Sequence, residues 1–584
     1  MELGKNLQKE IRIISVVVLT ASALIAGCKI QVVVPEGGSV TTVSGNIECA
    51  AGSTCEVDVS DDQFDETFQA VPADGFEFVG WVTRDRGLCG GSSADCNLPT
   101  TGFTGNDILE GFLANDAENF FLEAEFVRFS NSGLSALLET NADIALAAYS
   151  DSVDTAVSLK NAVDTFAAEP TQAYLDAAKV AWPASREPYG QTDVSRFRLS
   201  PIDSTNYMDE DGLEGEINAW PLGEALIDYV INADPDFGND QVGVITNGID
   251  INDGGVVDGT EMPPLNIISD SSIPITAELL ANTATADDEH DVIAGYHAIE
   301  FLLWGQDLND NAMVTNGDDR EQAVKTNGAP NLAFGGQRPL SDFTSDEFAS
   351  RRLTYLQVAA QKLIDDLESV RDGWLDGVDG NYRDRFTAFS DTAEAIQRLT
   401  EILTGMGTLS EGELAGERMQ IAFSSNSQED EHSCFSDNTH RDIVLNARGI
   451  SNSFYGIYGG YDSNLDGIDD ETTRAVDGFG FDDYAAELDV DTLTSIANEL
   501  DSRLQATAGS ADGIDAAARN GQPFDVLIQD ENRTSDNPVA QTILALNSQS
   551  SSIAALAEQL AIDVEVVDDD ASECDTTQPD TTCG

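Results

Sequence analysis

The segment Val292-Ile-Ala-Gly295-Tyr-His297-Ala-Ile-Glu300-Phe-Leu-Leu-Trp304 is the most informative stretch of the chain for its architecture. Between its two ends, the only strongly polar side chains are those of His297 and Glu300. A stretch that is apolar nearly all round predicts a helix buried on most sides. Because the two polar residues are three positions apart, they project from the same face of that helix.

A buried His and Glu need partners, because an unpaired charge in a protein core is costly. A metal ion is one such partner, since imidazole and carboxylate suit iron, zinc or manganese, and helices that carry this i, i+3 set build metal sites in bundles. The alternative is that His297 and Glu300 satisfy each other within the core. Gly295 would allow another backbone to approach closely, which fits either arrangement.

Helical periodicity extends over most of the chain. Residues 356, 360, 363, 367 and 370 are apolar and form one helical stripe, which Gly373 ends. Similar stripes occupy residues 134–166, 274–304, 384–406, 410–424, 491–507 and 538–562. We therefore predict a helical-bundle domain over residues 131–562, followed by an acidic C-terminal tail at 563–584.

Residues 28–130 are predicted to form a small β-rich domain stabilised by disulfides, because they lack helical periodicity and are rich in Gly, Val, Thr and Phe. Six cysteines fall into close pairs: Cys49 with Cys55, Cys89 with Cys96, and Cys574 with Cys583. We expect disulfides there, with crossed pairing among the first four left open. The isolated Cys434 is expected to be a buried thiol.

Residues 1–27 are predicted to be a signal peptide, since a basic start precedes an apolar run at 13–25 that is short for a membrane span. The run ends in Leu24-Ile-Ala-Gly-Cys28, which resembles the lipobox of bacterial lipoproteins and implies lipidation of Cys28. An ordinary signal peptide with a chance cysteine is the alternative. We expect a protein anchored by lipid in the cell envelope, and Lys29 resembles outer-membrane sorting in a Gram-negative bacterium.

The composition is strongly acidic. In 584 residues, 29 Lys and Arg stand against 105 Asp and Glu, which gives a formal net charge of −76. Such a chain attracts cations, and its charge argues against nucleic acid as a partner.

Two loops carry oxygen ligands at alternating positions before a glycine, and this resembles the start of a calcium loop. They are Asp462-Ser-Asn464-Leu-Asp466-Gly467 and Asp250-Ile-Asn252-Asp-Gly254. Thr473 stands where an EF-hand has its bidentate Glu, so the first loop is not an EF-hand. Structural calcium and a solvated acidic loop are both compatible with these sequences.

Four separated segments resemble the imelysin family, in particular its iron-regulated protein A branch. The first is Gly295-Tyr-His-Ala-Ile-Glu-Phe-Leu-Leu-Trp-Gly-Gln-Asp307. The others are Ala181-Trp-Pro-Ala-Ser-Arg-Glu-Pro-Tyr-Gly-Gln-Thr192, Asn218-Ala-Trp-Pro-Leu-Gly-Glu-Ala-Leu-Ile-Asp228, and Gly412-Glu-Leu-Ala-Gly-Glu-Arg-Met419 together with Gln428-Glu-Asp-Glu-His-Ser-Cys-Phe-Ser-Asp-Asn-Thr-His440. The resemblance implies a mainly α fold of two helical-bundle halves, export, and a link to iron or other metal acquisition. It places His297 and Glu300 at the metal site.

Residues of the other segments are candidates for the same site. Glu187 is the preferred third metal ligand, and Arg186 would bind an anionic ligand or hold a carboxylate in place. For each further candidate, a salt bridge, a helix cap or a structural hydrogen bond is the competing role. These ligand-pocket candidates are Trp220, Glu224, Asp228, Trp304, Asp437 and His440.

We therefore expect an envelope lipoprotein that binds a metal ion, iron or zinc, or an iron complex, with other iron-uptake proteins as partners. A metallopeptidase of the imelysin type is the alternative. Zinc peptidases need a second histidine one helical turn from the first, and Phe301 follows Glu300 instead. A structural or adhesive surface protein would leave the buried His297 and Glu300 unexplained.

Overall fold

The structure is a computed structural model that describes residues 28–59, 62–73, 75–113, 118–228, 266–281, 292–307, 335–390, 392–428, 430–529 and 532–560. The chain divides into two compact units, Met1–Phe129 and Ser130–Gly584. The predicted signal peptide, the side chain of Cys28, the tail at 563–584 with its two cysteines and the loop at 250–254 lie outside the described residues.

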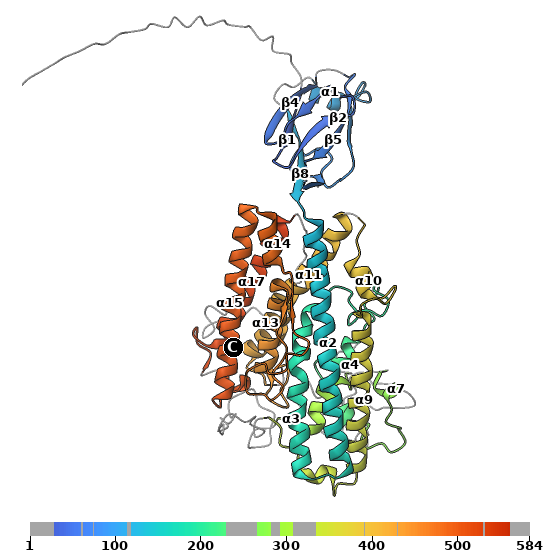
Figure 1. Cartoon of the computed structure of the whole chain (residues 1–584), viewed down its shortest axis with the longest axis vertical. Coiled ribbons are helices and arrows are strands. Elements are labelled where there is room, and N and C mark those ends of the chain that lie inside the picture. Colours follow the sequence, from blue (N-terminus) through green and yellow to red (C-terminus); the bar gives the residue numbers. More distant parts are fainter. Residues whose placement is uncertain are drawn as a thin grey trace, which may run out of the picture. The chain divides into compact units, whose positions relative to one another are not determined.

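The N-terminal unit consists of two four-stranded sheets (Figure 1). One sheet has the order β4-β1-β8-β6 and the other β3-β2-β5-β7, and among these strands only β1 and β8 pair in parallel. Its elements are β1 (Cys28–Val34), β2 (Gly38–Thr42), β3 (Glu48–Cys49), β4 (Ser53–Val59), β5 (Asp65–Pro72), β6 (Phe76–Trp81), β7 (Cys96–Pro99), α1 (Asp107–Leu113) and β8 (Asn119–Arg128).

The core of this unit is small and is reinforced covalently. Val32, Phe68 and Leu122 are fully buried, and burial alternates along β2, as expected for strands with one face toward the core. Disulfides join Cys49 to Cys55 and Cys89 to Cys96. The predicted pairing is therefore confirmed for these four cysteines, and crossed pairing among them is wrong.

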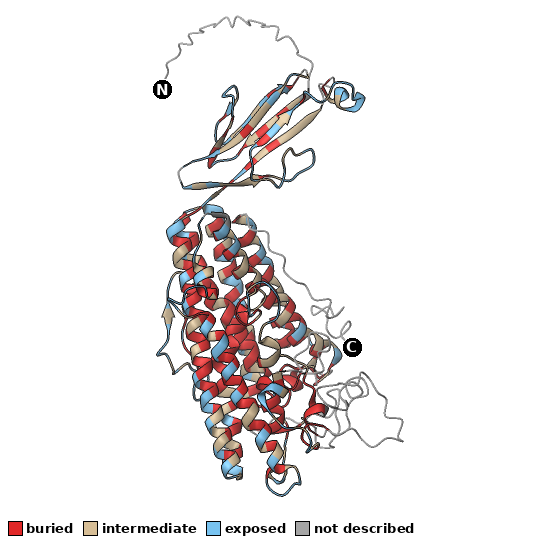
Figure 2. Cartoon of the chain, turned by 90° about the vertical axis from the view of Figure 1, so that its right-hand side faces the viewer, coloured by how far each residue is buried: buried red, intermediate tan, exposed pale blue. Residues whose placement is uncertain are grey.

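The C-terminal unit is a helical body of two packed groups, and the predicted fold class is confirmed (Figure 1). In one group α2 (Asn131–Ala168) packs on α3 (Gln172–Tyr189) and α9 (Ala349–Gly373). In the other, α17 (Pro538–Gln559) packs on α15 (Asp491–Arg519), α11 (Thr392–Thr408) and η4 (Leu409–Gln420), and α15 also packs on α13 (Thr439–Tyr455). Buried faces run along the length of these helices (Figure 2).

Shorter elements connect the long helices. They are η1 (Gly190–Ser195), α4 (Glu214–Ile217), α5 (Glu224–Ile227), α7 (Ala277–Ala281), α8 (Gly295–Trp304), η3 (Leu340–Phe343), α10 (Tyr382–Thr387), α12 (Ile421–Ser425), β9 (Ile457–Tyr458), β10 (Val476–Asp477), α14 (Phe481–Leu488) and α16 (Phe524–Leu527).

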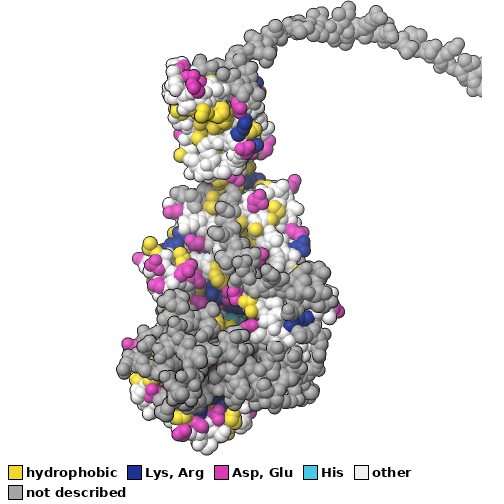
Figure 3. Space-filling model, turned by 180° about the vertical axis from the view of Figure 1, so that it is seen from behind, with side chains coloured by type: hydrophobic (Ala, Val, Ile, Leu, Met, Phe, Trp, Pro, Cys, Tyr) yellow, Lys and Arg dark blue, Asp and Glu magenta, His cyan; other side chains and the backbone are white. Residues whose placement is uncertain are grey.

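The predicted stripes match helices, with three differences. The stripe at 384–406 is divided between α10 and α11, since the described residues 388–390 between them are not helical. In the described parts of the stripe at 274–304 lie α7 and α8, and the extended backbone of Ala294 marks the start of α8 at Gly295. The stripe at 410–424 lies mainly in η4, a π-helical stretch, which apolar spacing cannot distinguish from an α-helix. No helix in the described part of the chain is long and apolar enough to span a membrane. Acidic side chains predominate over basic ones on the face shown in Figure 3.

Candidate metal centre

Helix α8 makes a close backbone contact with the end of α4 at its first residue, Gly295. Gly295 has a φ of +78°, and a Cβ atom there would collide with the carbonyl oxygen of Ile217 at the end of α4. Only glycine tolerates both conditions, because it has no Cβ atom. The predicted close approach at Gly295 is confirmed, and it fixes the start of the helix that carries His297 and Glu300.

His297 and Glu300 are completely buried and contact each other. The distance between His297 Nδ1 and Glu300 Oε2 is 2.9 Å. The second carboxylate oxygen of Glu300 accepts hydrogen bonds from the backbone amide of Ser436, at 2.9 Å, and from its hydroxyl, at 2.6 Å. The predicted shared face is therefore confirmed, and the two side chains do partly satisfy each other.

The second ring nitrogen of His297 does not take part in the contact with Glu300. His297 Nε2 is buried and has no hydrogen-bond partner among the described residues. A buried polar atom without a partner costs roughly 1–3 kcal/mol, so it calls for an explanation. The indole ring of Trp220 lies 5.0 Å from the imidazole ring, centroid to centroid, in an edge contact with an angle of 69° between the ring planes.

A second buried histidine completes the arrangement. The ring of His432 lies 4.8 Å from that of His297, and its Nε2 is 3.4 Å from Asn218 Nδ2. We call His297, Glu300 and His432 the histidine cluster. His432 was not among the predicted site residues, although it lies in one of the family-like segments of a chain with only four histidines.

Burial sets the protonation of the histidine cluster. Burial lowers the pKa of both imidazoles well below the usual value, and the positive charges of Arg186 and Arg418 lower both further. Burial also raises the pKa of Glu300 to about 8. Both imidazoles are therefore neutral at pH 7, which is the form that binds metal ions.

The predicted third ligand, Glu187, contacts an arginine in the structure. Its two carboxylate oxygens accept hydrogen bonds from Arg441 Nε and Nη2, each at 2.8 Å. To bind a metal, Glu187 would first have to leave this bidentate pair, which is a strong interaction. The prediction for Glu187 remains untested, and the structure brings His432 rather than Glu187 against His297.

Arg186 holds a carboxylate in place, one of the two roles expected for it. Its guanidinium donates to Asp442 Oδ1 at 2.8 and 3.1 Å and to the side-chain oxygen of Asn218. Asn218 also contacts His432 of the histidine cluster. Arg186 therefore orients the side chain of Asn218 beside that histidine.

The remaining candidates lie in varied surroundings. Asp228 accepts hydrogen bonds from Arg338 and Arg352, and Trp304 packs on Trp182 with ring centroids 5.7 Å apart. Glu224 begins α5 and is buried.

The ring of His440 contacts the carbonyl oxygen of Asp437 and the carboxylate of Asp515. Asn438 is the N-cap of α13, as considered for the segment at 437–440.

In the loop at 462–467 the acidic oxygens bind the loop's own backbone. Asp462 accepts from the amides of Asn464, Asp466 and Gly467. Asn464 Oδ1 accepts from the amide of Asp466 at 3.1 Å. These bonds hold a tight turn without requiring an ion, and calcium in this loop remains a prediction.

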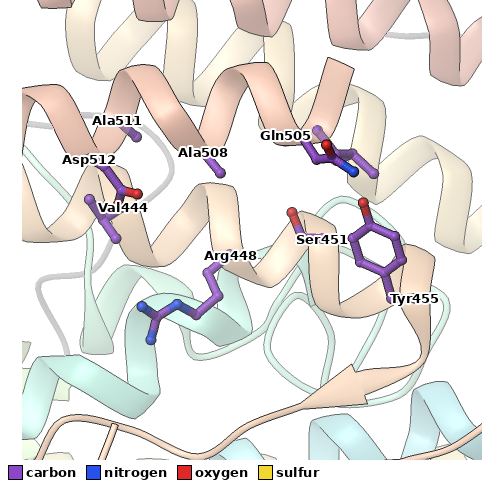
Figure 4. Close-up of a pocket in the computed structure, with 9 residues that line it drawn as sticks. Val444, Arg448, Ser451, Tyr455, Gln505, Ala508, Ala511 and Asp512 are labelled. Carbon is purple, nitrogen blue, oxygen red and sulfur yellow. The ribbon is translucent and has the colours of Figure 1, made fainter. Parts of the chain in front are cut away.

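A pocket of about 290 Å³ lies between α13 and α15, away from these residues (Figure 4). It is lined by Val444, Arg448, Ser451, Tyr455, Leu504, Gln505, Ala508, Ala511 and Asp512. None of the predicted site residues lines it.

Most of the helical unit matches a known family. The family model described as Imelysin (Peptidase_M75) matches residues 145–553. Among solved structures, the chain is similar to an iron-regulated protein A precursor from Parabacteroides distasonis, with a TM-score of 0.46 and 16% sequence identity, over 74% of this chain and 96% of that one. A comparison with curated proteins found no match.

Proposed function

Because the chain belongs to the imelysin family, we propose that it binds a metal ion, with iron as its main cargo, at the histidine cluster. The observation that carries this proposal is the buried His297 Nε2 without a partner beside a second neutral imidazole. A metal ion would satisfy that nitrogen. Two neutral imidazoles suit iron and zinc as ligands, and Glu300, which contacts His297 Nδ1, would orient the imidazole whose Nε2 faces the metal.

The residues around the cluster would act as its support. Ser436 orients Glu300, and Asn218, itself held by Arg186, orients His432. Such outer partners fix the direction of the ligand atoms and raise metal affinity. Binding would require Glu300 to be ionised and His432 to exchange its long contact with Asn218 for the metal.

We further propose that the protein acts in iron acquisition from a lipid anchor at Cys28 in the envelope of a Gram-negative bacterium, in the outer membrane, alongside other iron-uptake proteins. The support is the lipobox-like sequence before Cys28 and the family resemblance. The acidic surface would concentrate cations near the protein.

A metallopeptidase is the alternative, supported by the family's designation as a peptidase family and by the second histidine that His432 supplies. The burial of His297 and Glu300 weighs against it. A peptide bond must reach the metal and its water, and the complete burial of His297 and Glu300 among the described residues opposes that approach.

Titration of the metal-free, delipidated protein with Fe(II) and Zn(II) tests the proposal. Replacing His297 by Ala, or His432 by Ala, should weaken binding at the tightest site by at least about tenfold, the smallest effect typical of perturbing a metal site. The matched control is His440→Ala, which removes a histidine whose two ring nitrogens both contact other groups. It should leave affinity unchanged.

Equal affinity in the wild type and the His297→Ala variant would refute the histidine cluster as the metal site. A casein-degradation assay on the same three proteins addresses the alternative. Zinc-dependent proteolysis that disappears in the His297 and His432 variants and persists in His440→Ala would replace metal binding by catalysis as the function.

A further inference from the structure

Three carboxylates from distant parts of the sequence converge at a second place in the helical unit. One oxygen each from Asp307, Asp437 and Asp525 lies within 4.8 Å of the other two. We call these residues the carboxylate cluster. Asp307 follows α8, Asp437 precedes α13, and Asp525 belongs to α16. Asp437 and Asp525 are each only 4% exposed, so water does not solvate them freely.

Asp437 provides a second observation that points to a ligand. Its Oδ1 is buried and accepts no hydrogen bond from any described residue. Burial raises the pKa of Asp437 well above the usual value, and the negative charges of Asp525, Asp307 and Glu431 raise it further. The backbone amide of Gly335 opposes this shift by a hydrogen bond, but the strongest charges acting on Asp437 are all carboxylates.

The spacing of the oxygens fits one type of ion well. Calcium binds oxygen ligands at about 2.3–2.6 Å, so two oxygens of one calcium shell lie at most about 5 Å apart. The 4.8 Å limit within the carboxylate cluster satisfies that condition. Magnesium ligands lie at about 2.0–2.1 Å and would have to approach more closely.

We propose that Asp307, Asp437 and Asp525 hold a hard divalent cation of the calcium type, at a site separate from the histidine cluster. A set of oxygens without nitrogen or sulfur favours such cations over iron(II) or zinc. The remaining ligands would be waters or further oxygens, because calcium takes six to eight.

The cation would fix the segment that supports the histidine cluster. Asp437 directly follows Ser436, which donates two hydrogen bonds to Glu300, and the same segment carries His432. Tying Asp437 to Asp307 and Asp525 would therefore hold this segment against α8 and α16.

Calcium titration of the chelator-treated full chain tests the site, by calorimetry and by the shift of the thermal midpoint. The test variants are Asp437→Asn and Asp525→Asn, since Asn keeps the shape of Asp and also tolerates the φ of +56° at position 437. We expect the wild type to show one tight site that survives about 0.5 M NaCl, which screens weak surface binding. Each variant should bind at least about tenfold more weakly and lose the calcium-dependent rise of the midpoint.

Two controls isolate the site. Asp365→Asn removes one exposed carboxylate on α9 and should behave as the wild type does. His297→Ala should also keep its calcium affinity, so that failure of the proposed histidine site cannot be mistaken for failure of this one. Equal calcium affinity in Asp437→Asn, Asp525→Asn and Asp365→Asn would overturn the proposal, as would a wild type without a salt-resistant site.

Discussion

Two groups of buried carboxylates in the helical unit differ in how their charge is balanced. In the first group, which we call the arginine-paired group, each carboxylate contacts a guanidinium: Asp442 pairs with Arg186, Glu187 with Arg441, and Asp193 with Arg418. In the carboxylate cluster, Asp437 faces other carboxylates instead. The first arrangement is balanced by charges among the described residues, whereas the proposed cation would supply the positive charge in the second.

This difference distinguishes buried acidic residues that an arginine already neutralises from those that we propose to bind a cation. Glu187 was the preferred metal ligand because it is an acidic residue in a family-like segment. Its bidentate contact with Arg441 places it in the arginine-paired group. A buried carboxylate is thus a better ligand candidate when its neighbours repel it than when an arginine already neutralises it.

The largest expected loss of unfolding free energy comes from removing the arginine of a buried ion pair. Replacing Arg441 by Met leaves Glu187, which is 1% exposed, with an uncompensated charge. Loss of one partner of a buried pair typically costs about 3–5 kcal/mol of unfolding free energy. Urea unfolding followed by circular dichroism should show this loss in the helical unit.

The control for Arg441→Met is Arg371→Met. Arg371 pairs with Asp372 at the surface, where the two side chains are 25% and 55% exposed. Exposed pairs contribute about 0–1 kcal/mol. Similar losses in the two variants would show that burial does not distinguish these pairs and would remove the basis of the comparison.

A smaller, pH-dependent effect is expected at Glu413, another member of the arginine-paired group. Burial raises the pKa of Glu413, but the charges of Arg196 and Arg418 outweigh it and bring the pKa down to about 2. Since this lies below the ordinary value of about 4.3, ionised Glu413 stabilises the fold above pH 4.5, and this stabilisation disappears as the pH falls toward 2.

Glu413→Gln should therefore cost about 2 kcal/mol at pH 7, after allowing for the partial exposure of the side chain. The difference from the wild type should shrink between pH 4.5 and pH 2. Urea unfolding at pH 7, 4 and 3 measures it. A difference that stays constant over this range would mean that hydrogen bonding, rather than charge, holds Glu413.

The sequence predicted the helices and the centre of the candidate site because both depend on local pattern. The stripe from Leu356 to Val370 lies buried in α9, and the spacing of His297 and Glu300 gave their shared face on α8. The close backbone approach at Gly295 was expected from the same motif.

The partners of these residues could not be predicted in this way, because long-range contacts leave no periodic signal. His432 lies more than 130 positions from His297, and Asp525 is nearly 90 from Asp437. Whether a buried Glu meets an arginine or another carboxylate depends on which helices pack together. Glu187 and Asp437 therefore looked alike as candidates, and only the structure separates them.

The smallest expected change in unfolding free energy is a stabilisation rather than a loss. It provides the sharpest test of the difference between the arginine-paired group and the carboxylate cluster. In chelator, without a divalent cation, the charge of Asp437 is opposed by burial and by neighbouring carboxylates. Asp437→Asn removes that charge, so it should raise the unfolding free energy by about 1 kcal/mol, the lower end of the range for a buried unpaired group. Adding calcium should cancel the gain, because the wild type is then stabilised and the variant is not. If Asp437→Asn instead destabilises the cation-free protein as Arg441→Met does, the two groups are balanced in the same way and Asp437 has a partner within the chain.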